Sequence, residues 1–291
     1  MEIKKLKKQL LKEEMRRRHP NRTRNRWIGA IFAVLLVVGG IVFYFDKRDD
    51  LLQRRFEEAQ NLLRDSRYKE ASRAFGKIHE SRPRSDLAPR ALFHQGEILN
   101  ITLKQYKKAL IAYLQLLEQY PQSDLAIRSQ KKVAEIYKYR LQDNSSAIVA
   151  YQNLLDMGTT EPAESQYEIA DSYFKLNNFE QARIEFEGFL REHPESPRIA
   201  EVTYRIGVCL SIEGELEKSE EVLRRVVESW PEAPYAIEAR FALAEVLEEQ
   251  ERLKESLRIL EKLQGIYPNP QALEKKISQV RERIKKKKKA I

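Results

Sequence analysis

The pattern of apolar and polar residues divides the chain at one uncharged run. Residues 27–45 (WIGAIFAVLLVVGGIVFYF) hold nineteen positions without a charged residue, an Asn, a Gln or a Pro. As a helix this run would be about 28 Å long, close to the thickness of the hydrocarbon core of a bilayer. The long stretch after it is polar overall, with apolar residues recurring at helical spacing. The pattern therefore predicts an apolar helix followed by a helical body.

The body repeats one arrangement of large and small residues. In its clearest copy Tyr106 is followed by Ala109, Tyr113 and Pro121. Six copies of this arrangement recur at intervals of 35 to 38 residues, a regularity that chance does not produce. The third copy is degenerate and has Thr159 where the Pro is expected. The copies begin at Tyr68, Tyr106, Asn144, Phe179, Leu216 and Leu253.

Each copy predicts a hairpin of two helices. A small residue in the second helix lets the two helices approach closely, and the large residue one turn later lies on the same helix face. The closing Pro ends the second helix and sets the turn into the next copy. Since one hairpin cannot bury its apolar face alone, we expect the copies to stack into a solenoid. The small positions are Ala71, Ala109, Ala147, Ala182, Ser219 and Ser256 on the second helices, and Ala59, Gly96, Ala134, Ala170, Gly207 and Ala244 on the first.

Two segments depart from the regular pattern. Residues 156–162 replace the usual end of the third copy, and they fit either a bend between two halves of the solenoid or a tolerated loop. Residues 271–284 have the polar amphipathic pattern of the capping helix that solenoids need, and we expect Lys285–Lys289 to be a disordered tail. The whole sequence thus predicts an all-α chain with a transmembrane helix, a solenoid of about six hairpins and a capping helix.

Composition supports a helical protein and places the positive charge at the two ends. Leu, Glu, Ala, Arg and Lys dominate, while ten Gly and eleven Pro are too few for a turn-rich β protein. Residues 1–26 carry a net charge of +8 and residues 281–289 carry +6, out of a total of +9. The stretch between them is therefore mildly acidic, which argues against binding of nucleic acid.

The flanking charges also predict how the apolar run is oriented. The tail before the run is strongly basic, whereas residues 46–58 carry four basic and five acidic residues. Because positive charge is retained on the cytoplasmic side, we expect a cytoplasmic amino terminus and a body across the membrane. The run is longer than the apolar core of a cleaved signal, ends in the bulky residues 41–45, and is not followed by a Cys. We interpret it as an uncleaved signal-anchor.

These interpretations divide the chain into four segments. The segments are a basic cytoplasmic tail (1–26), a transmembrane helix (27–45), a solenoid (46–270), and a capping helix with a Lys-rich tail (271–291). The basic amino-terminal tail either holds the amino terminus in the cytoplasm during insertion, or lies on anionic headgroups or a cytoplasmic partner.

No catalytic chemistry is visible along the chain. The sequence has no HExxH, GxSxG, Walker or GxGxxG motif, and its carboxylates are scattered over predicted helix surfaces. The four His residues show no ligand spacing, and Cys209 lies in an apolar helical run typical of a buried core residue. We therefore expect no enzyme activity, no metal site and no cofactor.

The arrangement over residues 51–268 resembles the tetratricopeptide repeat. The small residues, the large residue four positions later and the closing Pro match that family's signature, which implies a right-handed α-solenoid. These copies run three residues longer and begin the next helix with Pro-x-Ser-x-x-Ala, as at Pro121. This variant resembles bacterial envelope proteins of the β-barrel assembly lipoprotein type and the Tol–Pal-associated periplasmic type. The lipid-acceptor Cys of the first type, and the coiled coil and cleaved signal of the second, are not found here.

One recurrence suggests a binding surface. Five copies carry an aromatic residue three positions before the small residue of the first helix. The resemblance implies that first helices line the concave face, so these rings would form a ladder along a groove for an extended or helical peptide. Alternatively, the rings only pack one repeat on the next. The predicted groove residues are the aromatic Phe56, Phe93, Tyr167, Tyr204 and Phe241, and the neighbouring carboxylates Glu97, Asp171 and Glu245.

The sequence therefore favours a non-catalytic scaffold that binds other proteins or peptides. With the resemblance, it predicts a single-pass protein of a bacterial inner membrane, in contact with its lipid, whose body faces the periplasm and serves envelope assembly or translocation-associated handling. Two alternatives stay open: a cytoplasm-facing receptor or adaptor, and a bridge from the membrane to peptidoglycan through the Lys-rich end. The sequence predicts neither the oligomeric state nor the identity of the partner.

Overall fold

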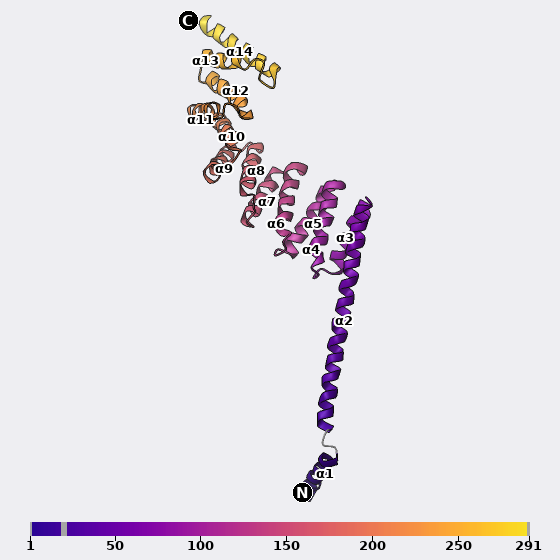
Figure 1. Ribbon diagram of the computed structural model, residues 1–291. Coiled ribbons are helices and arrows are strands. Elements are labelled where there is room, and N and C mark those ends of the chain that lie inside the picture. The colour runs from indigo at the N-terminus through magenta and orange to yellow at the C-terminus, as the bar shows by residue number, and fades with distance from the viewer. Residues whose placement is uncertain (1, 19–21, 290–291) are drawn as a thin grey trace. The chain divides into compact units, whose positions relative to one another are not determined.

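The structure is a computed structural model in which every described element is a helix (Figure 1). It describes residues 2–18 and 22–289, without the side chains at positions 16, 18, 22–26, 40–48 and 289. The chain forms two compact units, and the boundary between them, after Ala91, falls inside one helix.

The first unit is built around one long helix. Helix α1 (Glu2–Arg18) precedes α2 (Arg22–Arg64), whose 43 residues give a length of about 65 Å. Helix α2 contains the predicted apolar run and the first helix of the first hairpin without interruption, and α3 (Tyr68–Ser81) packs against its end. Over the described residues, no helix combines the length and the apolar content that a membrane crossing requires. The side chains of residues 40–45, the end of the predicted span, lie outside the described residues.

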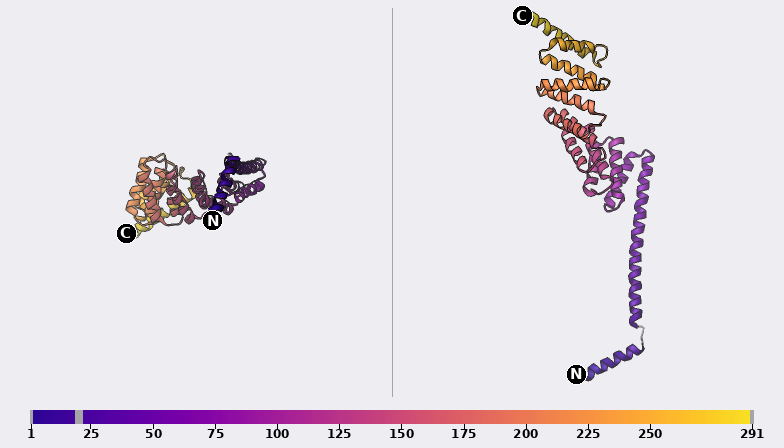
Figure 2. Two further views of the ribbon diagram at one scale, coloured as in Figure 1. Left: turned by 90° about the horizontal axis from the view of Figure 1, so that it is seen from below. Right: turned by 60° about the vertical axis from the view of Figure 1, so that its left-hand side comes forward.

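The second unit continues the pattern of paired helices. Neighbouring helices along the chain pack on one another, and each hairpin lies beside the next (Figure 2). The elements are α4 (Leu87–Glu97), η1 (Ile98–Thr102), α5 (Tyr106–Gln119), α6 (Ala126–Glu135), η2 (Ile136–Leu141), α7 (Asn144–Asp156), α8 (Pro162–Lys175), α9 (Phe179–Glu192), α10 (Ile199–Ile212), α11 (Leu216–Ser229), α12 (Pro234–Glu249), α13 (Leu253–Lys262) and α14 (Pro270–Lys289). This arrangement confirms the predicted all-α solenoid.

The predicted small residues lie where helices of a hairpin cross. A Cβ atom at Gly96 in α4 would lie 2.7 Å from the ring of Tyr113 in α5, and one at Gly207 would lie 2.7 Å from Leu223. The Ser219 hydroxyl donates a hydrogen bond of 2.7 Å to the Gly207 carbonyl across the same kind of crossing. The alternation of small and large residues therefore sets the distance between paired helices.

Two first helices end in a π-helical turn, η1 and η2. In both hairpins, the small crossing residue lies ten positions before the first residue of the second helix (Gly96 to Tyr106, Ala134 to Asn144). In the first hairpin, Ala59 precedes Tyr68 by only nine. A π-turn takes up one extra residue within an α-helix. The longer spacing of these copies is thus absorbed inside the first helix, and the crossing point is unchanged.

The end of the chain differs from the sequence prediction. Helix α14 continues through Lys289 rather than ending before a disordered Lys-rich tail. Lys is a good helix former, positive charge is favourable at a helix C-terminus, and Lys287 donates to Glu251 at 3.1 Å. Lys276 also contacts Glu245 at 3.1 Å and Glu248 at 2.9 Å on α12. Ion pairs therefore hold the last helix on its neighbour, while residues 290 and 291 lie outside the described chain.

Candidate functional site

The five predicted ladder rings lie on five first helices, with none on α6, and most of their surface is packed. Phe56 on α2, Phe93 on α4 and Tyr167 on α8 are buried. Tyr204 on α10 and Phe241 on α12 are half-buried. The three buried rings therefore do not present open faces, and as placed they belong to the packing of the repeats.

A cation from the following hairpin covers each of the three buried rings. The guanidinium carbon of Arg90 lies 5.3 Å from the centroid of Phe56. The corresponding distance is 4.7 Å from Arg128 to Phe93 and 4.2 Å from Arg198 to Tyr167. Arg stacks well on aromatic faces because its guanidinium is planar and weakly hydrated. These cation–π contacts tie one repeat to the next.

Aromatic rings take the place of Arg over the last two ladder positions. Tyr235 stacks on Tyr204 with 5.8 Å between the ring centroids, and Tyr267 stacks on Phe241 at 4.6 Å and 12°. Burial and the nearby Glu238 raise the pKa of Tyr267 to about 12, so its hydroxyl stays protonated and can donate to that carboxylate. Every ladder ring thus lies under a flat side chain from farther along the sequence. The prediction did not include these covering residues, although Arg90 and Arg128 each stand two positions after the Ala of the Pro-x-Ser-x-x-Ala pattern.

The three predicted carboxylates are engaged within the chain. Glu97 accepts a hydrogen bond of 2.8 Å from the Tyr113 hydroxyl, and Glu245 pairs with Lys276. Asp171 is buried and lies 2.8 Å from the Lys138 ammonium and 2.9 Å from the Lys175 ammonium. The structure therefore does not bring these carboxylates together as one open acidic surface. Their role in binding a partner stays a prediction.

A buried charge cluster between η2 and α8 was missed by the sequence reasoning. The Lys138 side chain is fully buried, pairs with Glu168 and Asp171, and donates 2.9 Å to the Glu168 carbonyl. Tyr139 donates to the Glu168 carboxylate. Burial alone would raise the pKa of Asp171, but Lys138 and Lys175 hold it below its ordinary value. The cluster joins the third and fourth hairpins through fully partnered charges.

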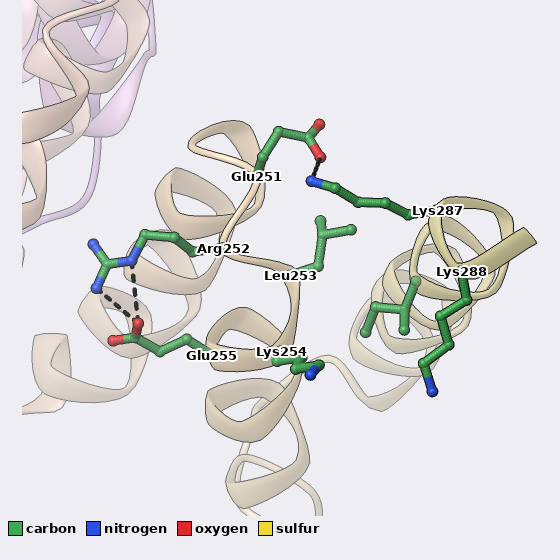
Figure 3. A pocket seen from close by; sticks show the side chains of 8 residues that line it. Glu251, Arg252, Leu253, Lys254, Glu255, Lys287 and Lys288 are labelled. Carbon is green, nitrogen blue, oxygen red and sulfur yellow. Dashed lines mark hydrogen bonds and ion pairs between the residues drawn. The ribbon is translucent and has the colours of Figure 1, made fainter. Parts of the chain in front are cut away.

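A cavity of about 440 Å³ lies between the start of α13 and the end of α14 (Figure 3). Leu253 and Ile284 give it an apolar wall. Four of the six charged side chains that line it are paired with one another, since Lys287 donates to Glu251 and the Arg252 guanidinium donates to Glu255 at 2.7 Å. The lining residues include none of the predicted groove residues. We therefore assign this cavity to the contact of the last helix with its neighbour.

Chemistry beyond binding has little support in this arrangement. In the described ranges, no group of three or more His, Cys, Asp and Glu side chains is placed to hold a metal ion. Cys209 is buried, and burial raises the pKa of its thiol to about 12, which keeps it protonated and unreactive. Nothing in the described chain points to an enzyme.

Comparison with known families agrees with this geometry. Family models described as tetratricopeptide repeat match residues 56–124, 136–197 and 167–234, and a further one matches residues 238–270. The chain belongs to the tetratricopeptide repeat family. Proteins of this family are generally non-catalytic scaffolds for protein–protein interaction, and the fold gives this chain the same general character. No curated protein matches the sequence.

Solved structures share the fold at low sequence identity. A tetratricopeptide repeat protein from Parabacteroides merdae is 18% identical with a TM-score of 0.52, over 79% of this chain and 87% of that one. YrrB, described as having an unusual peptide-binding site, is 18% identical with a TM-score of 0.51, over 69% and 96%. Part of a repeat protein from Cytophaga hutchinsonii is 20% identical with a TM-score of 0.51, over 72% and 77%. These likenesses show the fold alone, and the resemblance to envelope proteins stays a prediction.

Proposed function

We propose that this chain is a non-catalytic tetratricopeptide repeat scaffold, anchored in a bacterial inner membrane by α2, whose body binds proteins or peptides in the periplasm. Envelope assembly or translocation-associated handling is the setting that the sequence resemblance favours. The proposal combines the interaction scaffold of the fold with the apolar stretch inside α2.

The observation that carries the proposal is the exposure of apolar side chains along α2. Large apolar residues between Trp27 and Val38 are each at least 50% exposed. They occupy nine of the twelve positions from 27 to 38, so they cover all sides of the helix rather than one stripe. Burying such side chains stabilises by about 1.5–3 kcal/mol each, so leaving this stretch in water would cost on the order of 10 kcal/mol. A lipid or apolar environment around α2 removes that cost.

The charges beside this stretch support one orientation. The tail of residues 1–26 has a net charge of +8, and the segment after the apolar run is close to neutral. Since positive flanks stay in the cytoplasm, the repeats would extend from the opposite face of the membrane. The continuous α2 would then pass directly from the membrane into the first hairpin.

Reporter fusions after Ile291 test the orientation. We expect alkaline phosphatase, which is active only outside the cytoplasm, to be active there, and green fluorescent protein to be dark. A matched pair fused after Arg26, before the apolar run, should give the opposite pattern. Bright green fluorescence and inactive phosphatase after Ile291 would instead support the cytoplasm-facing alternative.

The binding role needs a test that does not depend on location. Crosslinking of the full chain in intact cells, followed by purification, should recover specific proteins attached to residues 51–268. A matched chain truncated after residue 50 keeps the tail and the apolar run but lacks the repeats. Recovery of the same proteins with the truncated chain would show that the repeats are not the binding part.

A further inference from the structure

Three consecutive second helices carry an exposed branched apolar residue at one register position. Ile111 on α5 is 57% exposed, Val149 on α7 is 60% exposed, and Ile184 on α9 is 44% exposed. Each stands five residues after the first residue of its copy, and the same position is Glu221 on α11 and Arg258 on α13. We call Ile111, Val149 and Ile184 the outer apolar row. Its confinement to three adjacent hairpins indicates a local contact surface rather than scattered exposed residues.

The charges on α5 oppose the dipole of that helix. Lys107 and Lys108 lie in its first turn and Glu118 in its last turn, although a helix favours negative charge at its N-terminus and positive charge at its C-terminus. On α9 the first turn holds Glu180, which is favourable there, and the last turn holds Arg191 next to Glu192, which accepts a hydrogen bond from Gln166. The side chains of Lys107, Lys108, Glu118, Glu180 and Arg191 are exposed, and none has an ion pair within the part of the chain that the structure describes. Helix α5 thus carries unfavourable charges that nothing within the described chain compensates.

The two ends of the outer apolar row are complementary to each other. We propose that the row binds a second copy of this chain about a two-fold axis parallel to α7, so that α5 of each copy lies against α9 of the other. Lys107 and Lys108 then face Glu180 of the second copy, and Glu118 faces Arg191 of the second copy. The contact is self-complementary, as a two-fold interface requires. It supplies the opposite charges that α5 lacks within one chain.

The same operation pairs the apolar residues of the row. Val149 meets its own equivalent at the axis, and Ile111 meets Ile184 of the second copy. Helix α7 carries the neutral Ser145 and Asn153 on either side of Val149. Its one charged residue, Asp156 in the last turn, is the position of α7 at which like charges would meet across the axis. Apolar residues at the centre with charged residues around them are the arrangement found in protein interfaces.

The size of the surface predicts a reversible contact. Three helices of about 20 Å length, spaced about 10 Å apart, cover on the order of 600 Å² on each copy, below the roughly 800 Å² of a standard interface. We therefore expect dimers to form at high local concentration and to dissociate on dilution. Crosslinking in the cell suits such a contact better than measurements on dilute protein.

Disulfide crosslinking tests the proposal at the axis. The chain has one native Cys, Cys209, which is buried, so a single introduced Cys reports its own surroundings. Full-length V149C should form a disulfide-linked dimer when intact cells are treated with a mild oxidant. The matched control is R258C, which places an exposed Cys at the same register position outside the row and should stay monomeric. Equal crosslinking of both variants, or none with V149C, would overturn the proposal.

Charge reversal distinguishes the proposed axis from other contacts. In the V149C background, the pair K107E and K108E should reduce the dimer roughly tenfold, because like charges then oppose one another across the interface. E180K should do the same. Co-expression of the two variants under different tags should restore a mixed dimer, since each α5 then meets an α9 of opposite charge. Failure of the mixture to recover would contradict the pairing of α5 with α9.

Discussion

The Lys138 ammonium lies 2.8 Å from the Asp171 carboxylate, and the Lys138 side chain is completely buried. Lys138 belongs to the π-turn η2 of one hairpin, whereas Asp171 belongs to α8 of the next. A buried charge is tolerated only when it is paired and hydrogen-bonded, as Lys138 is with Glu168 and Asp171. This contact therefore couples the folding of two neighbouring repeats.

Replacing Lys138 with Met should strongly destabilise the solenoid. The change leaves Glu168 and Asp171 buried without their shared cation, and breaking a buried pair in this way costs about 3–5 kcal/mol. Urea unfolding followed by far-ultraviolet circular dichroism measures the loss. The control is Lys175→Met, which removes a half-exposed partner of the same Asp171 and should cost less than about 1 kcal/mol. Equal losses in the two variants would contradict the assigned role of Lys138.

Protonation of Asp171 in acid should make the repeats less stable. Its folded pKa lies below the ordinary value of about 3.9, so its stabilising effect is present above that pH and disappears as the pH falls through the folded pKa. We expect Asp171→Asn to melt at a lower temperature than the parent at neutral pH. Below about pH 4 the two melting temperatures should converge. A difference that stays constant from neutral to acid pH would show that the charge of Asp171 is not the cause.

The turn inside each hairpin offers a matched pair of backbone tests. Lys104 and Gly214 occupy the same place, two residues before the second helix, with φ of 52° and 83°. A left-handed backbone is unfavourable for Lys and free for Gly, so Lys104→Gly should stabilise by about 0.5–1 kcal/mol. Gly214→Ala should destabilise by about 1 kcal/mol. Thermal melting measures both changes, and shifts of the melting temperature in the same direction would refute this explanation.

Replacing single ladder rings with Ala distinguishes rings that pack the repeats from rings that are available for binding. Tyr167 is buried under Arg198 and donates to Glu201, so Tyr167→Ala should cost about 3–5 kcal/mol. Tyr204 is only half-buried, and Tyr204→Ala should cost clearly less. Circular dichroism and thermal melting measure both. A Tyr167→Ala variant as stable as the parent would return that ring to the list of candidate binding residues.

The hairpins were predictable because their pattern is local. Gly96 stands in a column of small residues that recurs with every copy, and each small residue implies a close helix crossing whatever the rest of the chain does. The prediction that Lys285–Lys289 are disordered was wrong, because α14 continues through Lys289 and Glu251, which pairs with Lys287, lies 36 residues earlier in the sequence.

The candidate site was harder to predict because its contacts join different repeats. The aromatic periodicity placed Phe93 correctly on a first helix, but the side chain that covers it, Arg128, comes from the following hairpin. Lys138 was missed because a Lys on a predicted helix surface is ordinarily solvated, and only the packing of α8 encloses it. Sequence periodicity gives the position of a residue on its own helix, whereas burial depends on the neighbour.

Membrane extraction tests the anchored scaffold most directly. After alkaline carbonate treatment, the full chain should remain in the membrane pellet, because the proposal places the exposed apolar stretch of α2 in lipid. A variant with V34R and L35R should move to the soluble fraction, since charges in the middle of a span cost about 2.5–3.5 kcal/mol each. The matched control L51R changes an exposed residue of the same helix outside the run and should stay in the pellet. Release of the unchanged chain by carbonate would contradict the account.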